Sequence, residues 1–344
     1  MGQKKLLAIA FIIVIVELLL IMFLVDATKN KISQSLILNA YEVDKQLAAQ
    51  ISKSLEQDLK AVQNKLSLIA LFPEIQTGSS ESCNKKLDQV FPLVEGKVAN
   101  LVRINEKGEL YCAINRESIG INVLENEDLK KIILAPEHKP VLHRVVLSSV
   151  SNKYVAGIHV PVFSGGGHFR GSIGGVVYFD ELKNKYFKDF TLLESGRVML
   201  IDDNGDVLYH PTSPELVGKN LLSDEIVNQL SELDREDYKR QLEQVLDGIR
   251  HNVSGTIQYQ YQANSEMIAA YHPVEILEDR HWAVVVMIPI EEIVNQVDKD
   301  PLIAGFKNFS ALAMAMIATV LITQISLFVY FISHLNKHLK AQKQ

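Results

Sequence analysis

Two long apolar runs lie at opposite ends of the chain, and the segment between them has the mixed pattern of a protein exposed to water. Residues 6–25 and 309–332 are each long enough to cross a bilayer, since a transmembrane helix needs about 20 apolar residues. Basic residues flank both runs toward the chain termini, and such residues tend to stay in the cytoplasm. We predict two helices through the inner (plasma) membrane, with residues 1–5 and 333–344 cytoplasmic and residues 26–308 extracytoplasmic.

Two details of the apolar runs bear on this topology. Met22–Asp26 is bulky where a cleaved signal peptide needs small residues, so we expect the first run to be retained as an anchor. Glu17 is the one ionisable residue within the runs, and a carboxylate in lipid usually faces a partner. We expect that partner to be Thr323, Gln324 or Ser326 of the second run, or Glu17 of a second subunit. The alternative is a protonated side chain without a partner.

A helical stripe follows the first run and continues without Gly or Pro until Pro73. Its apolar residues recur in steps of three and four, the period of one helix face. They are Ile32, Leu36, Ala40, Val43, Leu47, Ile51, Leu55, Leu59, Val62, Leu66 and Ile69. We predict one helix from the membrane to about Phe72, within a helical segment at residues 26–75. Its stripe can pack against the domain or form a dimer seam, and we expect both, which predicts a homodimer.

Beyond a polar loop at Thr77–Glu81 the pattern becomes strand-like and repeats. Asn100–Ile114 and Val198–Tyr209 each contain two apolar runs around a turn with Gly, the signature of a β-hairpin. The first hairpin is followed by a helical or loop segment and the second by a helical segment at residues 221–248, and further strands follow both. The expected further strands are 154–162 and 172–179 after the first hairpin, and 255–262, 266–273 and 282–288 after the second. We predict two antiparallel modules of one design, at residues 76–190 and 191–300.

The order of these motifs resembles the double Cache family, the extracytoplasmic sensor domains of bacterial transmembrane receptors. In the second module the resemblance rests on Ile201–Pro211, Val217–Asn220 and the strands between residues 255 and 288. In the first module the matching residues are Cys83 with Leu87, Gly108–Ala113, and His159–Val162 through Asp180. The resemblance covers residues 27–308. It implies an α+β fold with two PAS-like sheets on a long N-terminal helix, a small ligand in the membrane-distal module, and a proximal module that passes the change on.

The net charge and the cysteines bear on two further points, the class of binding partner and a disulfide. The net charge of −6 argues against nucleic acid as a partner. Cys83 and Cys112 are the two cysteines, and both fall in the segment assigned to the oxidising side of the membrane. A disulfide between them would close a loop of about 30 residues and stabilise the fold by roughly 3 kcal/mol. The alternative is two unpaired small hydrophobic residues.

No motif in the sequence points to catalysis. Gly171–Gly175 lacks the spacing of a nucleophile elbow, and Ser164–Gly167 lacks the Lys-Ser/Thr of a phosphate loop. The spacing of His and Cys residues matches no metal motif. Tyr-His-Pro occurs twice, so His210 and His272 either share a pocket for a metal or an anion, or simply end strands where Pro is tolerated. We expect no enzyme activity, no cofactor and no metal.

Candidate ligand-binding residues lie in the first module. The two-residue period of a strand places Tyr178 and Asp180 on one face of their strand, and groups Arg144 with Val146 and Ser148 on an expected strand at residues 141–149. Arg offers a planar fork for a carboxylate and Asp an acceptor for an ammonium group, so Arg144 with Asp180 is able to hold a zwitterion. The alternative is a surface ion pair.

The resemblance qualifies this assignment. Asp180 matches the acidic position that amino-acid-binding Cache domains use for the amino group of the ligand, but the Arg-x-Trp-Tyr run of those domains is missing after Arg144. The ligand therefore stays unidentified. We place the site at Arg144, Tyr154, Tyr178, Asp180 and His143.

The pattern as a whole predicts a transmembrane sensor that binds a small extracytoplasmic molecule and shifts one membrane helix relative to the other. The segment after residue 332 is too short for an output domain. We expect the signal to pass to an output domain or to a separate partner such as a histidine kinase, a cyclase or a chemotaxis protein. The alternative is a two-span assembly protein such as a polysaccharide chain-length regulator, which carries a Pro-rich segment and long coiled helices that this pattern lacks.

Overall fold

The computed structural model describes most of the chain and divides it into two units. The described residues are 3–187, 195–230, 232–261, 265–277 and 280–299, with 305, 312, 315–316, 318–320, 322–324, 326–327 and 330 in addition. One unit is Ala40–Ile290, and the other combines Met1–Asn39 with Glu291–Gln344. Both β-sheets lie in the unit Ala40–Ile290.

The helices and strands follow the predicted order, beginning with one long helix. The helices are α1 (Gln3–Ile69), α2 (Pro73–Gln76), α3 (Ser80–Val90), η1 (Phe91–Leu93), η2 (Arg116–Ser118), α4 (Glu127–Leu134), α5 (Phe179–Leu182), η3 (Lys183–Phe187), η4 (Pro214–Leu216), α6 (Asp224–Val227), α7 (Glu232–Arg250) and α8 (Ile290–Lys299). The strands are β1 (Asn100–Ile104), β2 (Leu110–Ala113), β3 (Val141–Leu142), β4 (Val146–Leu147), β5 (Tyr154–Phe163), β6 (Phe169–Tyr178), β7 (Arg197–Asp202), β8 (Val207–Tyr209), β9 (Gly255–Tyr261), β10 (Ser265–Leu277) and β11 (Arg280–Pro289).

Two antiparallel sheets of the same topology confirm the internal repeat. The first has the order β2-β1-β6-β5-β3, with β4 also paired to β5, and the second has the order β8-β7-β11-β10-β9. We call the first sheet with its helices the distal module and the second the proximal module. Even the first turn is built twice, because Asn105 Oδ1 and Asp202 Oδ1 each accept two backbone N–H groups of their own turn. Gly108 and Gly205 supply the positive φ that each turn needs.

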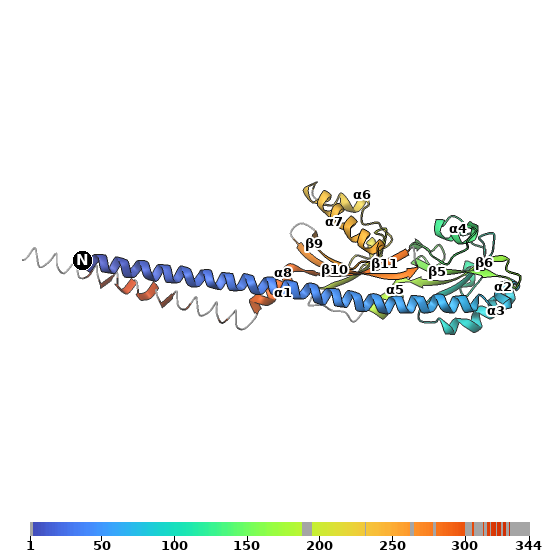
Figure 1. The fold of residues 1–344 in the computed structure, drawn as a ribbon, viewed down its shortest axis with the longest axis horizontal. Helices are drawn as coiled ribbons and strands as arrows, with labels where there is room; N and C mark the ends of the chain where they lie inside the picture. Colours follow the sequence, from blue (N-terminus) through green and yellow to red (C-terminus); the bar gives the residue numbers. More distant parts are fainter. Residues whose placement is uncertain are drawn as a thin grey trace, which may run out of the picture. The chain divides into compact units, whose positions relative to one another are not determined.

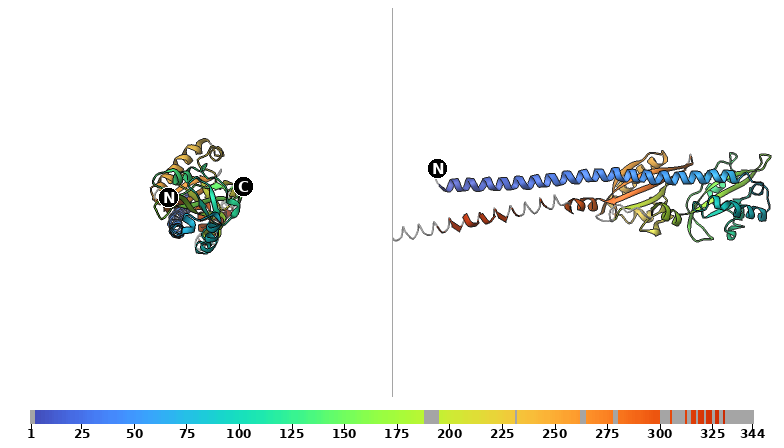
Figure 2. Two further views of the ribbon diagram at one scale, coloured as in Figure 1. Left: turned by 90° about the vertical axis from the view of Figure 1, so that its right-hand side faces the viewer. Right: turned by 90° about the horizontal axis from the view of Figure 1, so that it is seen from below.

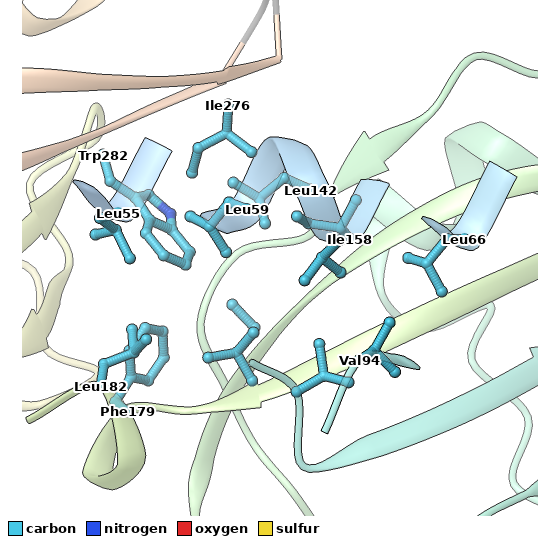
Figure 3. Packing of buried hydrophobic residues seen from close by; sticks show 14 of the residues in the cluster. Leu55, Leu59, Leu66, Val94, Leu142, Ile158, Phe179, Leu182, Ile276 and Trp282 are labelled. Atoms are coloured by element: carbon cyan, nitrogen blue, oxygen red, sulfur yellow. The ribbon is translucent and has the colours of Figure 1, made fainter. Parts of the chain in front are cut away.

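The predicted stripe of α1 forms the centre of the largest core. From Ala48 to Ile69 its apolar side chains are buried against one face of both sheets, and Figures 1 and 2 show this part of α1 running along the two modules. Trp282 of β11 and Phe179, which directly follows β6, meet in this core with ring centroids 5.7 Å apart. Figure 3 shows the Trp282 ring beside Leu55 of α1. The two modules therefore share one continuous hydrophobic core.

A separate helix covers the opposite face of each sheet, as Figure 1 shows. In the distal module α4 packs Leu129, Ile132 and Ile133 on residues of β1 and β2. In the proximal module α7 packs on β7, β9, β10 and β11 through Leu242, Val245 and other apolar residues. Each sheet thus lies between α1 and its own covering helix, and the face under that covering helix is where each module has its cavity.

Two expectations at the level of secondary structure were wrong. The strand expected at residues 141–149 is divided into β3 and β4, because the backbone N–H of Arg144 donates to Asp128 of α4 and its carbonyl bonds the His143 ring. The single helical segment expected at residues 221–248 is formed by α6 and the longer α7.

The membrane topology keeps the status of a prediction. Over the residues that the structure describes, no helix is both long enough and apolar enough to cross a membrane. The expected contact of Glu17 falls on a side chain outside the described ones, and the predicted tail at residues 333–344 lies outside the described residues altogether.

Cys83 of α3 and Cys112 of β2 are joined in a disulfide, with their Cα atoms 6.1 Å apart and a sequence separation of 29. Both are fully buried in the core under α1. Reduction of the bond should therefore lower the free energy of unfolding by roughly 3 kcal/mol, mainly because the unfolded chain becomes less constrained. Thermal unfolding of the full chain with and without reductant measures this, and a Cys83→Ala/Cys112→Ala variant that is insensitive to reductant serves as the control. An equal shift in both proteins would contradict the expectation.

Candidate ligand-binding site of the distal module

A cavity of about 370 Å³ lies between the sheet of the distal module and its cover. Its floor is formed by β1, β5 and β6 through residues such as Asn100, Val155, His159 and Tyr178. Its walls come from the segment between Asn115 and Leu129, which leads into α4, and from residues 146–150. The volume falls within the range of about 300–1,000 Å³ that small-molecule sites occupy. We call this space the distal cavity.

Two histidines lie at the base of the distal cavity because glycines leave room for their rings. His143 and His159 line it, with ring centroids 5.6 Å apart. A Cβ atom on Gly174 would come within 2.2 Å of the His159 ring, and one on Gly157 within 2.9 Å of His143 Nε2. Glycine at these two strand positions therefore leaves the space that the two imidazole rings occupy, which any larger residue would fill.

Both imidazoles are held in the neutral form. Burial lowers the pKa of His143 below its usual value, although its bond to the Arg144 carbonyl opposes the shift. Burial, reinforced by the neighbouring His143, lowers the pKa of His159 further. His159 is only 1% exposed, and its Nδ1 has no hydrogen-bond partner among the described residues. This nitrogen is closed off from the cavity, and an unpaired buried polar atom is a cost to the fold.

Four asparagines supply the distal cavity with side-chain amide hydrogen-bond donors. Asn100, Asn115, Asn122 and Asn126 all line the cavity. The Oδ1 atom of each accepts a backbone N–H, from Asn115, Glu117, Leu124, and Asp128 with Leu129, respectively. These bonds assign the side-chain amides, and the NH₂ groups make no hydrogen bond to a described residue. Glu125 is the one charged residue among the described lining residues. The cavity thus offers amide donors without a cationic side chain.

Only some of the predicted site residues line the distal cavity. His143 and Tyr178 line the distal cavity, whereas Arg144 and Tyr154 do not. The side chain of Arg144 is exposed, because the broken strand turns it outward while its backbone N–H donates to Asp128. Tyr154 lies over Gly218 of the proximal module. The side chain of Asp180 is outside the described ones, so the grip of Arg144 and Asp180 on a zwitterion has no support from the cavity.

Sequence reasoning missed His159 and the asparagines. Asn115, Asn122 and Asn126 had a readable signal, since each accepts a backbone N–H two or three residues further on, the habit of Asn at turns and helix starts. Asn100 had no such signal, because it accepts the N–H of Asn115, 15 residues away. His159 had none, because only the packing of Gly174 opposite it shows that the ring lies across the floor. Of the two alternatives for Tyr-His-Pro, the shared pocket is not formed, since His210 lines a cavity of the proximal module and His272 is not among its lining residues. The strand-end alternative holds for His210, which follows β8, and is wrong for His272, which lies within β10 and pairs with Val284.

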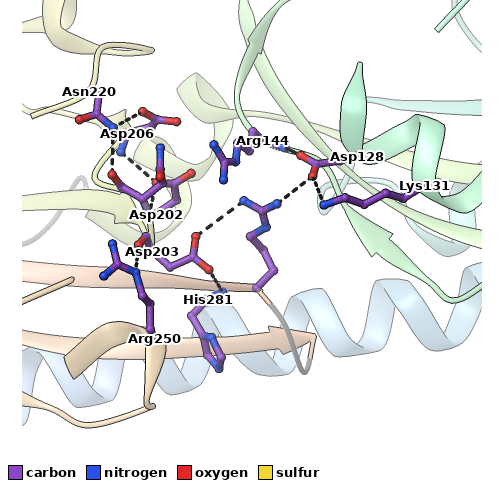
Figure 4. Close-up of polar contacts among 11 residues, drawn as sticks. Asp128, Lys131, Arg144, Asp202, Asp203, Asp206, Asn220, Arg250 and His281 are labelled. Atoms are coloured by element: carbon purple, nitrogen blue, oxygen red, sulfur yellow. Dashed lines mark hydrogen bonds and ion pairs between the residues drawn. The ribbon is translucent and has the colours of Figure 1, made fainter. Parts of the chain in front are cut away.

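An ion-pair chain joins the cover of the distal cavity to the proximal module (Figure 4). Asp128 of α4 accepts a bond from Arg280 Nη2 at 2.9 Å, and Arg280 Nη1 lies 3.7 Å from Asp203. Asp203 also accepts the backbone N–H of His281, and its carbonyl accepts Arg250 Nε at the end of α7. Burial alone would raise the pKa of Asp128, but the Arg144 N–H, Arg280 and Lys131 outweigh it and lower that pKa. The carboxylate therefore stays ionised between the modules.

Comparisons with known proteins agree with this architecture. A family model described as a Cache domain, dCache_1, matches residues 28–297, so the chain belongs to the double Cache family. No curated protein matches it. Among solved structures, the ligand binding domain of the Pseudomonas aeruginosa PAO1 amino acid chemoreceptor PctB with L-Gln is 14% identical, with a TM-score of 0.54, and the match covers 73% of this chain and 92% of that one.

Two further structures show the same fold. The periplasmic sensory domain of the Campylobacter jejuni chemoreceptor Tlp1 is 15% identical, with a TM-score of 0.55, and the match covers 75% of this chain and 98% of that one. An extracellular ligand binding receptor from Desulfohalobium retbaense DSM5692 is 14% identical, with a TM-score of 0.53 over 70% of this chain. The chain spans only 39% of the length of that receptor. At such identities the likeness concerns the fold alone.

Proposed function

We propose that this chain is a sensor that binds an uncharged polar small molecule in its distal cavity. The observation that carries the proposal is the set of four asparagine NH₂ donors around two neutral, buried histidines. A ligand with hydroxyl or amide groups accepts bonds from these donors through its oxygen atoms. Glu125, as the one charged lining residue described, disfavours an anion.

An amino acid is a poorer fit, although PctB was solved with L-Gln. The described lining residues of the distal cavity include no arginine or lysine for a carboxylate, and a buried carboxylate without such a partner is costly. A relative with the same fold does not fix the ligand, because fold and ligand chemistry vary separately.

We further propose that residues 6–25 and 309–332 anchor the sensor in the inner membrane, with both termini cytoplasmic. A ligand needs only a differential affinity for two arrangements of the modules to shift the membrane helices. The Asp128–Arg280–Asp203 chain offers a route, because α4 covers the distal cavity and Arg280 belongs to the proximal module. Homodimer formation along α1 and output to a histidine kinase, a cyclase or a chemotaxis protein are part of this proposal.

The boundaries of 76–190 and 191–300 for the two modules belong to the same proposal, and so does the absence of catalysis. The Cache family match favours a sensor over a polysaccharide chain-length regulator, since Cache domains are ligand-binding modules.

A thermal-shift screen of the full chain in lipid nanodiscs tests the ligand class. We expect stabilisation by an uncharged polyol, sugar or amide, and none by amino acids or dicarboxylates at equal concentration. Asn122→Asp keeps the acceptor for the Leu124 N–H but removes an NH₂ donor and adds negative charge. It should therefore lower the affinity for the stabilising compound at least tenfold. Asn105→Asp makes the same Asn-to-Asp change in a turn outside the cavity, and it should leave the affinity for the compound unchanged. A best hit that is a carboxylate, or equal effects of both variants, would contradict the proposal.

A further inference from the structure

The proximal module contains a second cavity that its sensor role does not explain. It measures about 300 Å³ and lies between the sheet and α7. Leu242 and Val245 of α7 face Ile257, Ala269 and Met287 of the sheet across it. The described lining residues are mostly aliphatic or aromatic, and none of them is charged. We call this space the proximal cavity.

Its size and lining indicate a binding site rather than a packing defect. Cores are packed with few voids larger than a water molecule, whereas this space reaches the lower end of the range for small-molecule sites. Water gains little in a space whose walls offer few polar partners. An apolar molecule would be held there by burial alone, without the amide donors that distinguish the distal cavity.

One polar group is fixed in the wall of the proximal cavity. The Nδ1 atom of His210 accepts the backbone N–H of Ser213 at 2.9 Å and that of Thr212 at 3.4 Å. In a neutral imidazole the proton is then on Nε2, and burial lowers the pKa of His210. Nε2–H makes no hydrogen bond to a described residue. His210, which directly follows β8, therefore presents a fixed N–H donor in a mainly apolar lining.

We propose that the proximal cavity is a second binding site, for an uncharged and mainly apolar molecule whose carbonyl or hydroxyl oxygen accepts a hydrogen bond from His210 Nε2. A fatty-acid carboxylate is excluded from this class, because the described lining offers no cation to pair with it. The other polar groups of the described lining belong to Gln229, Gln241, Gln260, Tyr238, Tyr259 and Tyr271, and these are uncharged side chains as well. The site is independent of the distal cavity and does not require that the distal ligand be bound.

Photo-labelling of the full chain tests this proposal. The protein in phosphatidylcholine nanodiscs is irradiated with a ten-carbon alkyl ketone that carries a diazirine, and the labelled peptides are identified by mass spectrometry. We expect label on peptides from α7 and β10, and at least tenfold stronger competition by 2-decanone than by decanoate. An excess of the distal ligand should not displace the label, which separates a failure here from a failure of the proposed sensor ligand.

Variants locate the label. Ala269→Phe fills the cavity from β10, where Ala269 lies between Ile257 and Met287, and should reduce labelling at least tenfold. His210→Ala should weaken competition by 2-decanone but not by decane, and it tests the site even if the larger substitution impairs folding. Val253→Phe, at an exposed position after α7, serves as the control. Label confined to the terminal apolar runs, equal competition by decanoate, or labelling unchanged in both cavity variants would overturn the proposal.

Discussion

Replacement of Asp44 by Asn is expected to stabilise the protein at pH 8 and to remove the loss of stability that this one carboxyl group contributes between pH 4 and 7. Asp44 lies on α1 with 0% of its surface exposed, and neither carboxylate oxygen has a hydrogen-bond partner among the described residues. Burial raises its pKa from 3.8 to about 7. Ionisation of this residue is therefore costly in the folded protein and free in the unfolded one.

The sign of the effect follows from proton binding. Between pH 3.8 and 7 the folded state holds a proton on Asp44 that the unfolded state has released, so stability falls as the pH rises. The raised pKa lowers the free energy of unfolding by about 4 kcal/mol over this window, at about 1.4 kcal/mol for each pH unit. The stability from this group is fully present below pH 3.8 and lost above pH 7.

Chemical unfolding of the full chain at pH 4, 6 and 8 measures this dependence. Asp58 on the same helix provides a matched control with the opposite sign. Burial alone would raise its pKa, but bonds from Lys185, Lys97 and Tyr186 hold that pKa well below the usual range. Asp58→Asn should therefore destabilise the protein at neutral pH. The other buried groups that titrate in this range, among them His143, His159 and Asp202, are common to both proteins and cancel in the difference between them. A stability gain of Asp44→Asn over the wild type that does not grow from pH 4 to pH 8, or a variant that is less stable than the wild type at pH 8, would contradict this expectation.

Replacement of Arg280 by Met should lower the free energy of unfolding by about 4 kcal/mol, because removal of one partner of a buried ion pair leaves the other charge uncompensated. The side chains of Arg280 and Asp128 are each only 11% exposed. The second substitution, Asp128→Asn, should recover part of the loss, since it removes the unpaired charge. Arg170→Met breaks an exposed pair with Glu106 and should cost at most about 1 kcal/mol.

Denaturant unfolding of the single and double variants measures the coupling between the two side chains. The double variant Arg280→Met/Asp128→Asn should be more stable than the sum of the two single effects predicts. Strictly additive losses would mean that the two modules are not linked through this pair, and the proposed route between them would have to be abandoned.

The repeat and the long helix could be predicted because both follow from local periodicity. The stripe of α1 is regular from Ile51 to Ile69 and is buried over that length, and the hairpin turns carry their own signals in Asn105, Gly108 and Gly205. These features need no knowledge of distant contacts. The family could be predicted for the same reason, since its motifs occur in the same order in both modules.

The site was harder to predict because its geometry depends on contacts distant in sequence. The two-residue period placed Arg144 in the pocket on the assumption of a continuous strand. Asp128 breaks that strand by accepting the Arg144 N–H from 16 residues away. The link between the modules had no local signal either, because Arg280 reaches Asp128 across 152 residues.

Hydrogen–deuterium exchange of the full chain in nanodiscs, with and without the uncharged ligand found in the thermal-shift screen, shows whether that ligand binds in the distal cavity. We expect protection of backbone amides at residues 115–129 and 143–150, which form the wall of the distal cavity. Protection confined to α7 and the proximal sheet, or no change in the distal wall at saturating ligand, would contradict this expectation.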